Sequence, residues 1–196
     1  MPEVIEFKVG RKVVYPAHGV GRIVSEEMQI IAGHDLSLYV IDFPEAKMTL
    51  RVPVKRAKES GLRILSNLKD VDKAITVLKG RAKAGRGMWS RRAKEYEDKI
   101  NSGNIIFIAE VVRDLHKNVD DPDRSYSERI IYESALGRLA GEFAAVNESS
   151  IDDSTEQLVK ILKSRKSLAP VASIKASNDD IDVEELVGLD DEFEAA

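Results

Sequence analysis

The first third of the chain alternates apolar and polar residues in short runs that are separated by turn-forming residues. The runs rich in Val, Ile, Tyr and Leu are RKVVYP, GRIVSEEMQII, LSLYVIDF and KMTLRVPV, and turn signals lie between them at 17–19, 33–35 and 43–45. Runs of this kind predict β-strands. Four or five strands before residue 66 are too few for a sandwich with a large core, so we predict a small, curved SH3-like or Tudor-like β-barrel.

From about residue 67 the apolar period changes from two towards 3.6, which predicts helices for the remainder of the chain. We expect Asp70 to cap a first helix that ends near Leu78. A second helix is expected over residues 88–101, ended by Gly103. The apolar positions of this second helix recur every three or four residues and form one stripe: Trp89, Ala93, Tyr96 and Ile100.

Three further helices follow from the same spacing. The third is ended by the DDPDR segment at 120–124, because proline cannot continue a helix. In the fourth, Gly137 and Gly141 are expected to admit a close neighbour, and in the fifth Ser150 and Asp153 form a variant capping box. The apolar positions that mark these helices are Ile105, Ile108, Val112 and Leu115, then Tyr132, Leu136, Leu139, Phe143 and Val146, then Leu158, Ile161 and Leu162.

The predicted fold class is therefore α+β, with a small N-terminal SH3/Tudor-like β-barrel followed by a separate all-α domain of about five helices. We place the domain boundaries at 1–66 for the barrel and 67–166 for the helices. Residues 167–196 are expected to form a disordered acidic tail, because that segment has too few apolar groups to offset the entropy of ordering.

Charge is unevenly distributed along the chain. The net charge is −4, but nine of the 34 acids and none of the bases lie in residues 176–196, leaving 25 acids against 30 bases in the rest. The stretch from Lys73 to Lys94 has eight bases and no acid. Such a stretch favours contact with a polyanion such as nucleic acid. The alternative is that these bases only solubilise helix surfaces.

Several classes of site and location are disfavoured by the composition. The chain has no cysteine, which excludes disulfides and thiolate ligands, and its three histidines (His18, His34 and His116) have no metal-ligand companion at short spacing. The glycine-rich segment 80–87 lacks the Gly-Lys-Ser/Thr ending of a phosphate-binding loop. We therefore expect no metal, no cofactor and no enzymatic activity. No apolar run approaches the ~20 residues of a membrane span, and no signal peptide is visible, so we expect a cytoplasmic protein.

Two residue patterns are open to a functional and to a structural interpretation. Trp89, the sole tryptophan, either completes the apolar stripe of its helix or stays exposed beside Arg91, Arg92 and Lys94, where an indole could wedge against unstacked bases. Arg51 precedes Val52 and Pro53, and proline at this position indicates an edge strand or the end of a strand. Such an edge either accepts a strand from a partner protein or is blunted to prevent aggregation.

Four segments resemble the CarD/CdnL family of bacterial transcription regulators. They are FKVGRKVVYPAHGVGRI at 7–23, TLRVPV at 49–54, MWSRRAKEYEDKINSGN at 88–104 and IAEVVRDL at 108–115. The resemblance extends over residues 7–162, in the family's order, and VVYPAHGVG and WSRR are its most specific parts.

The resemblance implies a Tudor-like domain that binds the RNA polymerase β subunit, similar to the polymerase-interacting domain of transcription-repair coupling factor. It also implies a helical domain that binds the minor groove of promoter DNA at the upstream fork of the bubble and stabilises the open complex, notably at ribosomal RNA promoters. The DNA-binding residues that we expect are Trp89 as the wedge and the cations Arg86, Arg91, Arg92, Lys94 and Arg129. The polymerase-binding residues that we expect are Arg51, Pro53, Val40 and Gln29, the last standing where some relatives carry a polymerase-facing arginine.

We expect a monomer without membrane contact that associates with the nucleoid through RNA polymerase. Two alternatives belong to other classes: a nucleoid-type protein that binds duplex DNA without polymerase, and an enzyme that acts on nucleic acid. The first would bind bare duplex tightly in physiological salt, and the second would need a metal or nucleophile cluster that the sequence does not reveal.

Overall fold

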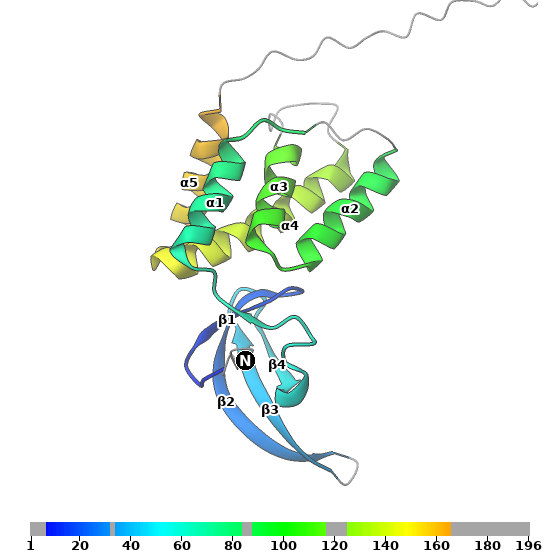
Figure 1. The fold of residues 1–196 in the computed structure, drawn as a ribbon, viewed down its shortest axis with the longest axis vertical. Helices are drawn as coiled ribbons and strands as arrows, with labels where there is room; N and C mark the ends of the chain where they lie inside the picture. Colours follow the sequence, from blue (N-terminus) through cyan, green and yellow to red (C-terminus); the bar gives the residue numbers. More distant parts are fainter. Residues whose placement is uncertain (1–6, 32–33, 84–87, 117–124, 166–196) are drawn as a thin grey trace, which may run out of the picture. The chain divides into compact units, whose positions relative to one another are not determined.

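An antiparallel β-sheet is followed by a set of helices in this computed structural model, which describes residues 7–31, 34–83, 88–116 and 125–165 (Figure 1). The predicted α+β class is confirmed. Within the described residues, the strands are β1 (Lys12–Tyr15), β2 (Gly19–Ile31), β3 (His34–Phe43), β4 (Met48–Pro53) and β5 (Arg63–Ile64), with a short 3-10 helix at Val54–Arg56. The helices are α1 (Leu68–Lys79), α2 (Trp89–Asn101), α3 (Ile105–Leu115), α4 (Tyr126–Asn147) and α5 (Ile151–Lys163).

The five strands form one sheet in the order β4-β3-β2-β1-β5. The strand β4 therefore lies at an edge, as expected from the presence of Pro53 in it. One face of the sheet carries the apolar core, because alternate residues of a strand point to the same face. The core residues of this region include Val13, Ile23, Tyr39, Ile41, Phe43 and Val52. A register shift between Ile23 and Ser25 opposite β3 marks a β-bulge, beyond which β2 and β3 continue as a long hairpin.

The helix bounds follow the predicted apolar stripes closely, and one predicted cap is wrong. Asn67, not Asp70, caps α1: the Asn67 side chain accepts a hydrogen bond from the backbone N–H of Asp70. Asp70 lies inside the first turn, where its carboxylate pairs with Lys73 at 3.0 Å. The predicted cap of α5 is confirmed, because Ser150 Oγ accepts from the N–H of Asp153 at 3.0 Å.

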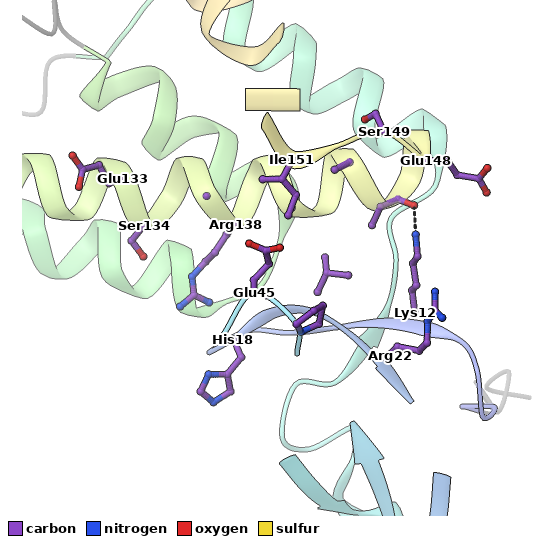
Figure 2. Close-up of a pocket in the computed structure, with 17 residues that line it drawn as sticks. Lys12, His18, Arg22, Glu45, Glu133, Ser134, Arg138, Glu148, Ser149 and Ile151 are labelled. Carbon is purple, nitrogen blue, oxygen red and sulfur yellow. Dashed lines mark hydrogen bonds between the residues drawn. The ribbon is translucent and has the colours of Figure 1, made fainter. Parts of the chain in front are cut away.

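The helices pack around a common apolar core. Its buried members come from all five described helices, among them Leu78, Tyr96, Val112, Leu139 and Leu158. The expectation for Gly137 and Gly141 is wrong, because a Cβ at either position would meet no atom within 4 Å. Both glycines instead line a cavity of about 770 Å³ beside α4 (Figure 2).

Some predictions fall on residues outside the described ranges. These are the helix-ending segment at 120–124, Arg86 and the rest of the segment 84–87, and the acidic tail. The described residues all belong to one compact unit, and the division into domains at residue 66 stays a prediction. Among the described residues, no helix is long and apolar enough to span a membrane.

Candidate nucleic-acid and polymerase interfaces

Trp89 is the first residue of α2 and lies at the outer end of the apolar stripe of that helix. Tyr96 and Ile100, further along the stripe, are buried, whereas Trp89 and Ala93 are partly exposed and pack against the helical core. The indole and the ring of Tyr96 are tilted, with centroids 6.4 Å apart. Burial, aided by the nearby carboxylate of Asp114, raises the pKa of Tyr96 above its ordinary value. The ring of Trp89 is thus neither fully buried in the core nor fully exposed.

The exposed side of the indole is fixed by two neighbours. Its Nε1 donates a hydrogen bond to Ser127 Oγ in the first turn of α4, at 2.8 Å. The guanidinium of Arg92, one turn along α2, lies over the ring at 5.2 Å from its centroid. Trp89 is therefore held at the surface, where the beginnings of α2 and α4 meet.

Arg92 differs from the other cations predicted to bind DNA. Its side chain is only 26% exposed and lies 3.9 Å from Glu128 of α4, which is itself buried. Its Nε is also buried, with no hydrogen-bond partner among the described residues. The contacts of Arg92 with the indole and with Glu128 make it a support for Trp89 as much as a free cation.

Arg91, Lys94 and Arg129 extend into solvent. Arg91 is 82% exposed and pairs with Glu95 one turn along α2 at 3.4 Å. Arg129 lies in the first turns of α4, 3.8 Å from Glu133 and over the exposed ring of Tyr126 at 5.5 Å. Exposed pairs of this kind contribute about 0–1 kcal/mol, so they leave both guanidiniums available to phosphates.

The structure brings Trp89, Arg92 and the first turn of α4 together, while two other members of the basic stretch have partners on other helices. Lys73 lies in α1 and pairs with Asp70, while the backbone N–H of Lys83 donates to Asp114 of α3. Ser127 and Tyr126 are neighbours of the predicted site that the sequence did not indicate. The capping box of Ser125 and Glu128 marks the start of α4 in the sequence, because Ser125 Oγ accepts from the N–H of Glu128 at 3.2 Å, but it does not place that start beside Trp89.

The four residues predicted to bind polymerase share one face of the sheet. In the antiparallel register, Val40 of β3 pairs with Arg51 of β4, Leu38 with Pro53, and Leu36 with Gln29 of β2. Directly paired residues of an antiparallel sheet have side chains on the same face. This face lies opposite the core, whose residues Tyr39, Ile41 and Val52 occupy the alternate positions.

Two apolar residues of this face are buried without belonging to the core. Leu38 is 4% and Val40 is 7% exposed. Polar side chains surround them: Glu27 accepts a hydrogen bond from Gln29 Nε2 at 3.3 Å and lies 3.6 Å from Arg51 Nε. Glu27 and Leu38 also lie on this face, and the sequence did not indicate them. Their place on it follows from the strand register beyond the bulge.

No group of three or more His, Asp or Glu side chains within the described ranges could hold a metal ion. The ring of His18 stacks on Tyr15 with centroids 5.6 Å apart. Nδ1 of His116 lies 2.7 Å from the hydroxyl of Tyr132.

Comparison with known families identifies both halves of the described chain. Residues 7–66 match the model of the CarD-like/TRCF RID domain, and residues 73–160 match the model of the CarD C-terminal domain. The chain belongs to the CarD family. A curated relative, "Putative transcription factor YdeB" of Bacillus subtilis (strain 168), is 27% identical over 140 residues, which cover 71% of this chain and 92% of the relative. The resemblance stated from the motifs is confirmed, and with it the Tudor-like class of the N-terminal sheet.

Proposed function

We propose that this CarD-family chain is a transcription regulator that binds the β subunit of RNA polymerase and the upstream edge of the promoter bubble. It thereby stabilises the open complex during initiation, notably at ribosomal RNA promoters. The family match and the name of the Bacillus subtilis relative support a role in transcription. The observation that supports DNA binding is the position of the Trp89 indole, which Ser127 and Arg92 hold at the surface.

A fixed indole is suited to act as a wedge at the fork. Aromatic side chains stack on unpaired bases or insert between base steps, and basic neighbours hold the backbone. Because the ring is already positioned in the free protein, less conformational entropy is lost on binding. In this proposal Arg92 orients the ring, while Arg91, Lys94 and Arg129 contact phosphates of the minor-groove strands, joined by Arg86.

We propose that the edge strand β4 binds the polymerase. An exposed edge can add a strand from a partner through backbone hydrogen bonds. Arg51 and Pro53 lie in this edge, and Val40 and Gln29 lie on the same face in the next strands. In the free protein Arg51 pairs with Glu27, so a carboxylate of the β subunit would compete for that guanidinium.

Stabilisation of the open complex requires that the protein bind it more tightly than the closed complex. A ligand with equal affinity for two states shifts neither. A preference of about 1.4 kcal/mol is enough to raise the ratio of open to closed complexes about tenfold. A single well-stacked aromatic contributes about 1–3 kcal/mol, so the wedge alone can account for the effect.

The test compares Trp89→Ala with Arg51→Glu. Trp89→Ala should shorten the lifetime of the open complex at a ribosomal RNA promoter while polymerase binding stays normal, and Arg51→Glu should reduce polymerase binding itself. Because Trp89 also packs on the core, Trp89→Phe serves as a matched variant that keeps a smaller apolar ring and loses the bond to Ser127. An unchanged lifetime in a folded Trp89→Ala protein would contradict the wedge.

The exposed cations also favour the alternative of a nucleoid-type DNA-binding protein that needs no polymerase. A titration of duplex DNA with the protein alone distinguishes the two functions. The proposed regulator should bind bare duplex weakly at physiological salt, because few phosphate contacts give little affinity by themselves. Nanomolar binding without polymerase would favour the alternative.

A further inference from the structure

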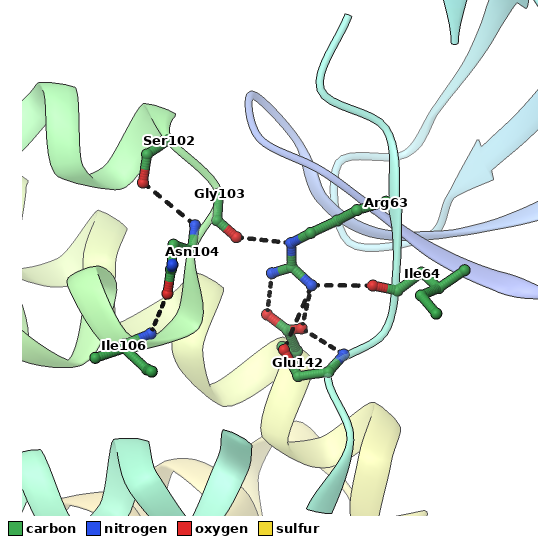
Figure 3. Close-up of polar contacts among 8 residues, drawn as sticks. Arg63, Ile64, Ser102, Gly103, Asn104, Ile106 and Glu142 are labelled. Carbon is green, nitrogen blue, oxygen red and sulfur yellow. Dashed lines mark hydrogen bonds and ion pairs between the residues drawn. The ribbon is translucent and has the colours of Figure 1, made fainter. Parts of the chain in front are cut away.

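An ion pair between a partly exposed arginine and a buried glutamate joins the sheet to the helices. Nη1 and Nη2 of Arg63, in β5, donate to Oε1 and Oε2 of Glu142, in α4, at 2.6 and 2.7 Å (Figure 3). Oε1 also accepts from the backbone N–H of Ser66 at 3.0 Å, in the three-residue segment that connects β5 to α1. The residue Glu142 is 1% exposed, so these partners take the place of solvent around its carboxylate.

The same guanidinium reaches a third element. Nε of Arg63 donates to the carbonyl oxygen of Gly103, in the turn between α2 and α3, at 2.7 Å. A guanidinium is planar, and its fork fits a carboxylate in few orientations. The bidentate pair therefore fixes the direction in which β5 meets α4, and the bond to Gly103 fixes it relative to the end of α2.

The turn between β1 and β2, part of the VVYPAHGVG motif, makes a second set of contacts with the helices. The ring of Pro16 packs so closely on Gly103 that a Cβ there would lie 2.9 Å from Pro16 Cγ. The carbonyl oxygen of Ala17 accepts from Nη2 of Arg138, in α4, at 2.8 Å. Burial lowers the pKa of Arg138 below its ordinary value, which agrees with its enclosed position.

Polar contacts, more than apolar packing, connect α4 to the sheet. Arg138, Glu142 and Ala145 lie on one face of the helix at intervals of four and three residues. Nζ of Lys12 donates to the carbonyl oxygen of Ala145 at 3.4 Å, beside the cavity of about 770 Å³ that Gly137 and Gly141 line (Figure 2). Directional bonds therefore lie at the margin of a space that side chains do not fill.

We propose that the Arg63–Glu142 pair and the Pro16–Gly103 contact form a joint that fixes the orientation of the sheet relative to the helices, and that this orientation positions Trp89 for DNA while β4 is bound to polymerase. The second half of this inference rests on the proposed function. Arg63 and Glu142 are positioning residues, since they touch neither proposed partner. The joint gives the VVYPAHGVG motif a role that neither binding surface explains.

Replacement of one partner of the pair and replacement of both should have different effects. Arg63→Gln removes the cation that faces the buried carboxylate of Glu142, and loss of one partner of such a pair destabilises the closed joint. The double variant Arg63→Gln/Glu142→Gln has no such charge, and its two amides can still bond to each other. The double variant should therefore open the joint less than Arg63→Gln does.

The orientation can be measured directly on the full chain. The sequence has no cysteine, so cysteines introduced at the exposed positions Lys58 and Lys163 accept a donor and an acceptor dye without interference. Single-molecule energy transfer should give one narrow distance distribution in the starting protein, a broad one in Arg63→Gln and an intermediate one in the double variant. Arg56→Gln, which removes an exposed arginine from the same region, should leave it narrow. A narrow distribution in Arg63→Gln would refute the joint.

Open-complex lifetime tests the positioning role. If the released protein is correctly oriented in about a tenth of molecules, its stabilisation of the open complex should fall about tenfold at saturating protein, with polymerase affinity unchanged. Suppose that Arg63→Gln gives a broad distance distribution but stabilises the open complex normally, and that Trp89→Ala shortens the lifetime. That combination would overturn the positioning role. If Trp89→Ala has no effect either, the proposed function fails and the positioning role fails with it, whereas the broad distribution would still support the joint.

Discussion

Replacement of Gly103 by alanine should destabilise the protein by more than the backbone conformation alone explains. Gly103 has φ +69°, a left-handed conformation that costs a residue with a Cβ about 1–2 kcal/mol. The added Cβ would also lie 2.9 Å from Pro16 Cγ, so the turn between β1 and β2 must shift. Overpacking of this kind costs about 1–3 kcal/mol. We therefore expect Gly103→Ala to lower the free energy of unfolding by about 2–5 kcal/mol.

Gly10 provides a matched control for the backbone part of this cost. It has φ +86°, and a Cβ there would meet nothing within 4 Å. Urea unfolding, followed by the fluorescence of Trp89 and by circular dichroism, should give a cost of only about 1–2 kcal/mol for Gly10→Ala. Shortening Pro16 to alanine should relieve most of the excess in Gly103→Ala. Equal costs for Gly103→Ala and Gly10→Ala would refute the close contact at the joint.

Two further predictions concern the helical region. Asn67→Ala should destabilise by about 1 kcal/mol through loss of the α1 cap, whereas Asp70→Ala should cost less, and equal or reversed costs in chemical denaturation would contradict the corrected cap. The hydrogen bond from Lys99 at 2.7 Å lowers the pKa of Glu110, so its contribution to stability is complete above the ordinary carboxyl pKa of about 4.3 and is lost as the pH falls through the lowered folded-state value. Stability measured against pH should accordingly fall less steeply below about pH 4.3 in Glu110→Gln than in the parent; parallel curves would count against the bond.

The elements were predictable because each carries a local signal. The stripe of α2 and the Ser150 cap of α5 were read correctly, since side-chain spacing and capping chemistry depend on residues that are near in sequence. The cap of α1 was misplaced by three residues because Asn67 and Asp70 are both good capping residues and only the backbone conformation distinguishes them. Gly137 and Gly141 in α4 suggested a close neighbour, but glycine also occurs where a helix faces an open space.

The surroundings of the candidate site were less predictable, because they depend on contacts between distant segments. Nothing near Trp89 in sequence indicates Ser127 as its hydrogen-bond partner, 38 residues away. Arg63 and Glu142, 79 residues apart, read in the sequence as two ordinary surface charges. A buried pair is distinguishable from two solvated charges only after the tertiary fold has brought them together.

The two edges of the sheet explain why one small sheet can serve both a partner and the helices. In the order β4-β3-β2-β1-β5, the outermost strands are β4 and β5. The β5 edge is two residues long, and its Arg63 donates hydrogen bonds to Glu142 and Gly103 of the helical region. The β4 edge is six residues long and carries Arg51 in solvent. A long exposed edge invites pairing with another strand, whereas a short and covered edge does not. A polymerase strand added at β4 would therefore leave the joint at β5 intact, and the three intervening strands would transmit the position of the polymerase to the helices that hold Trp89.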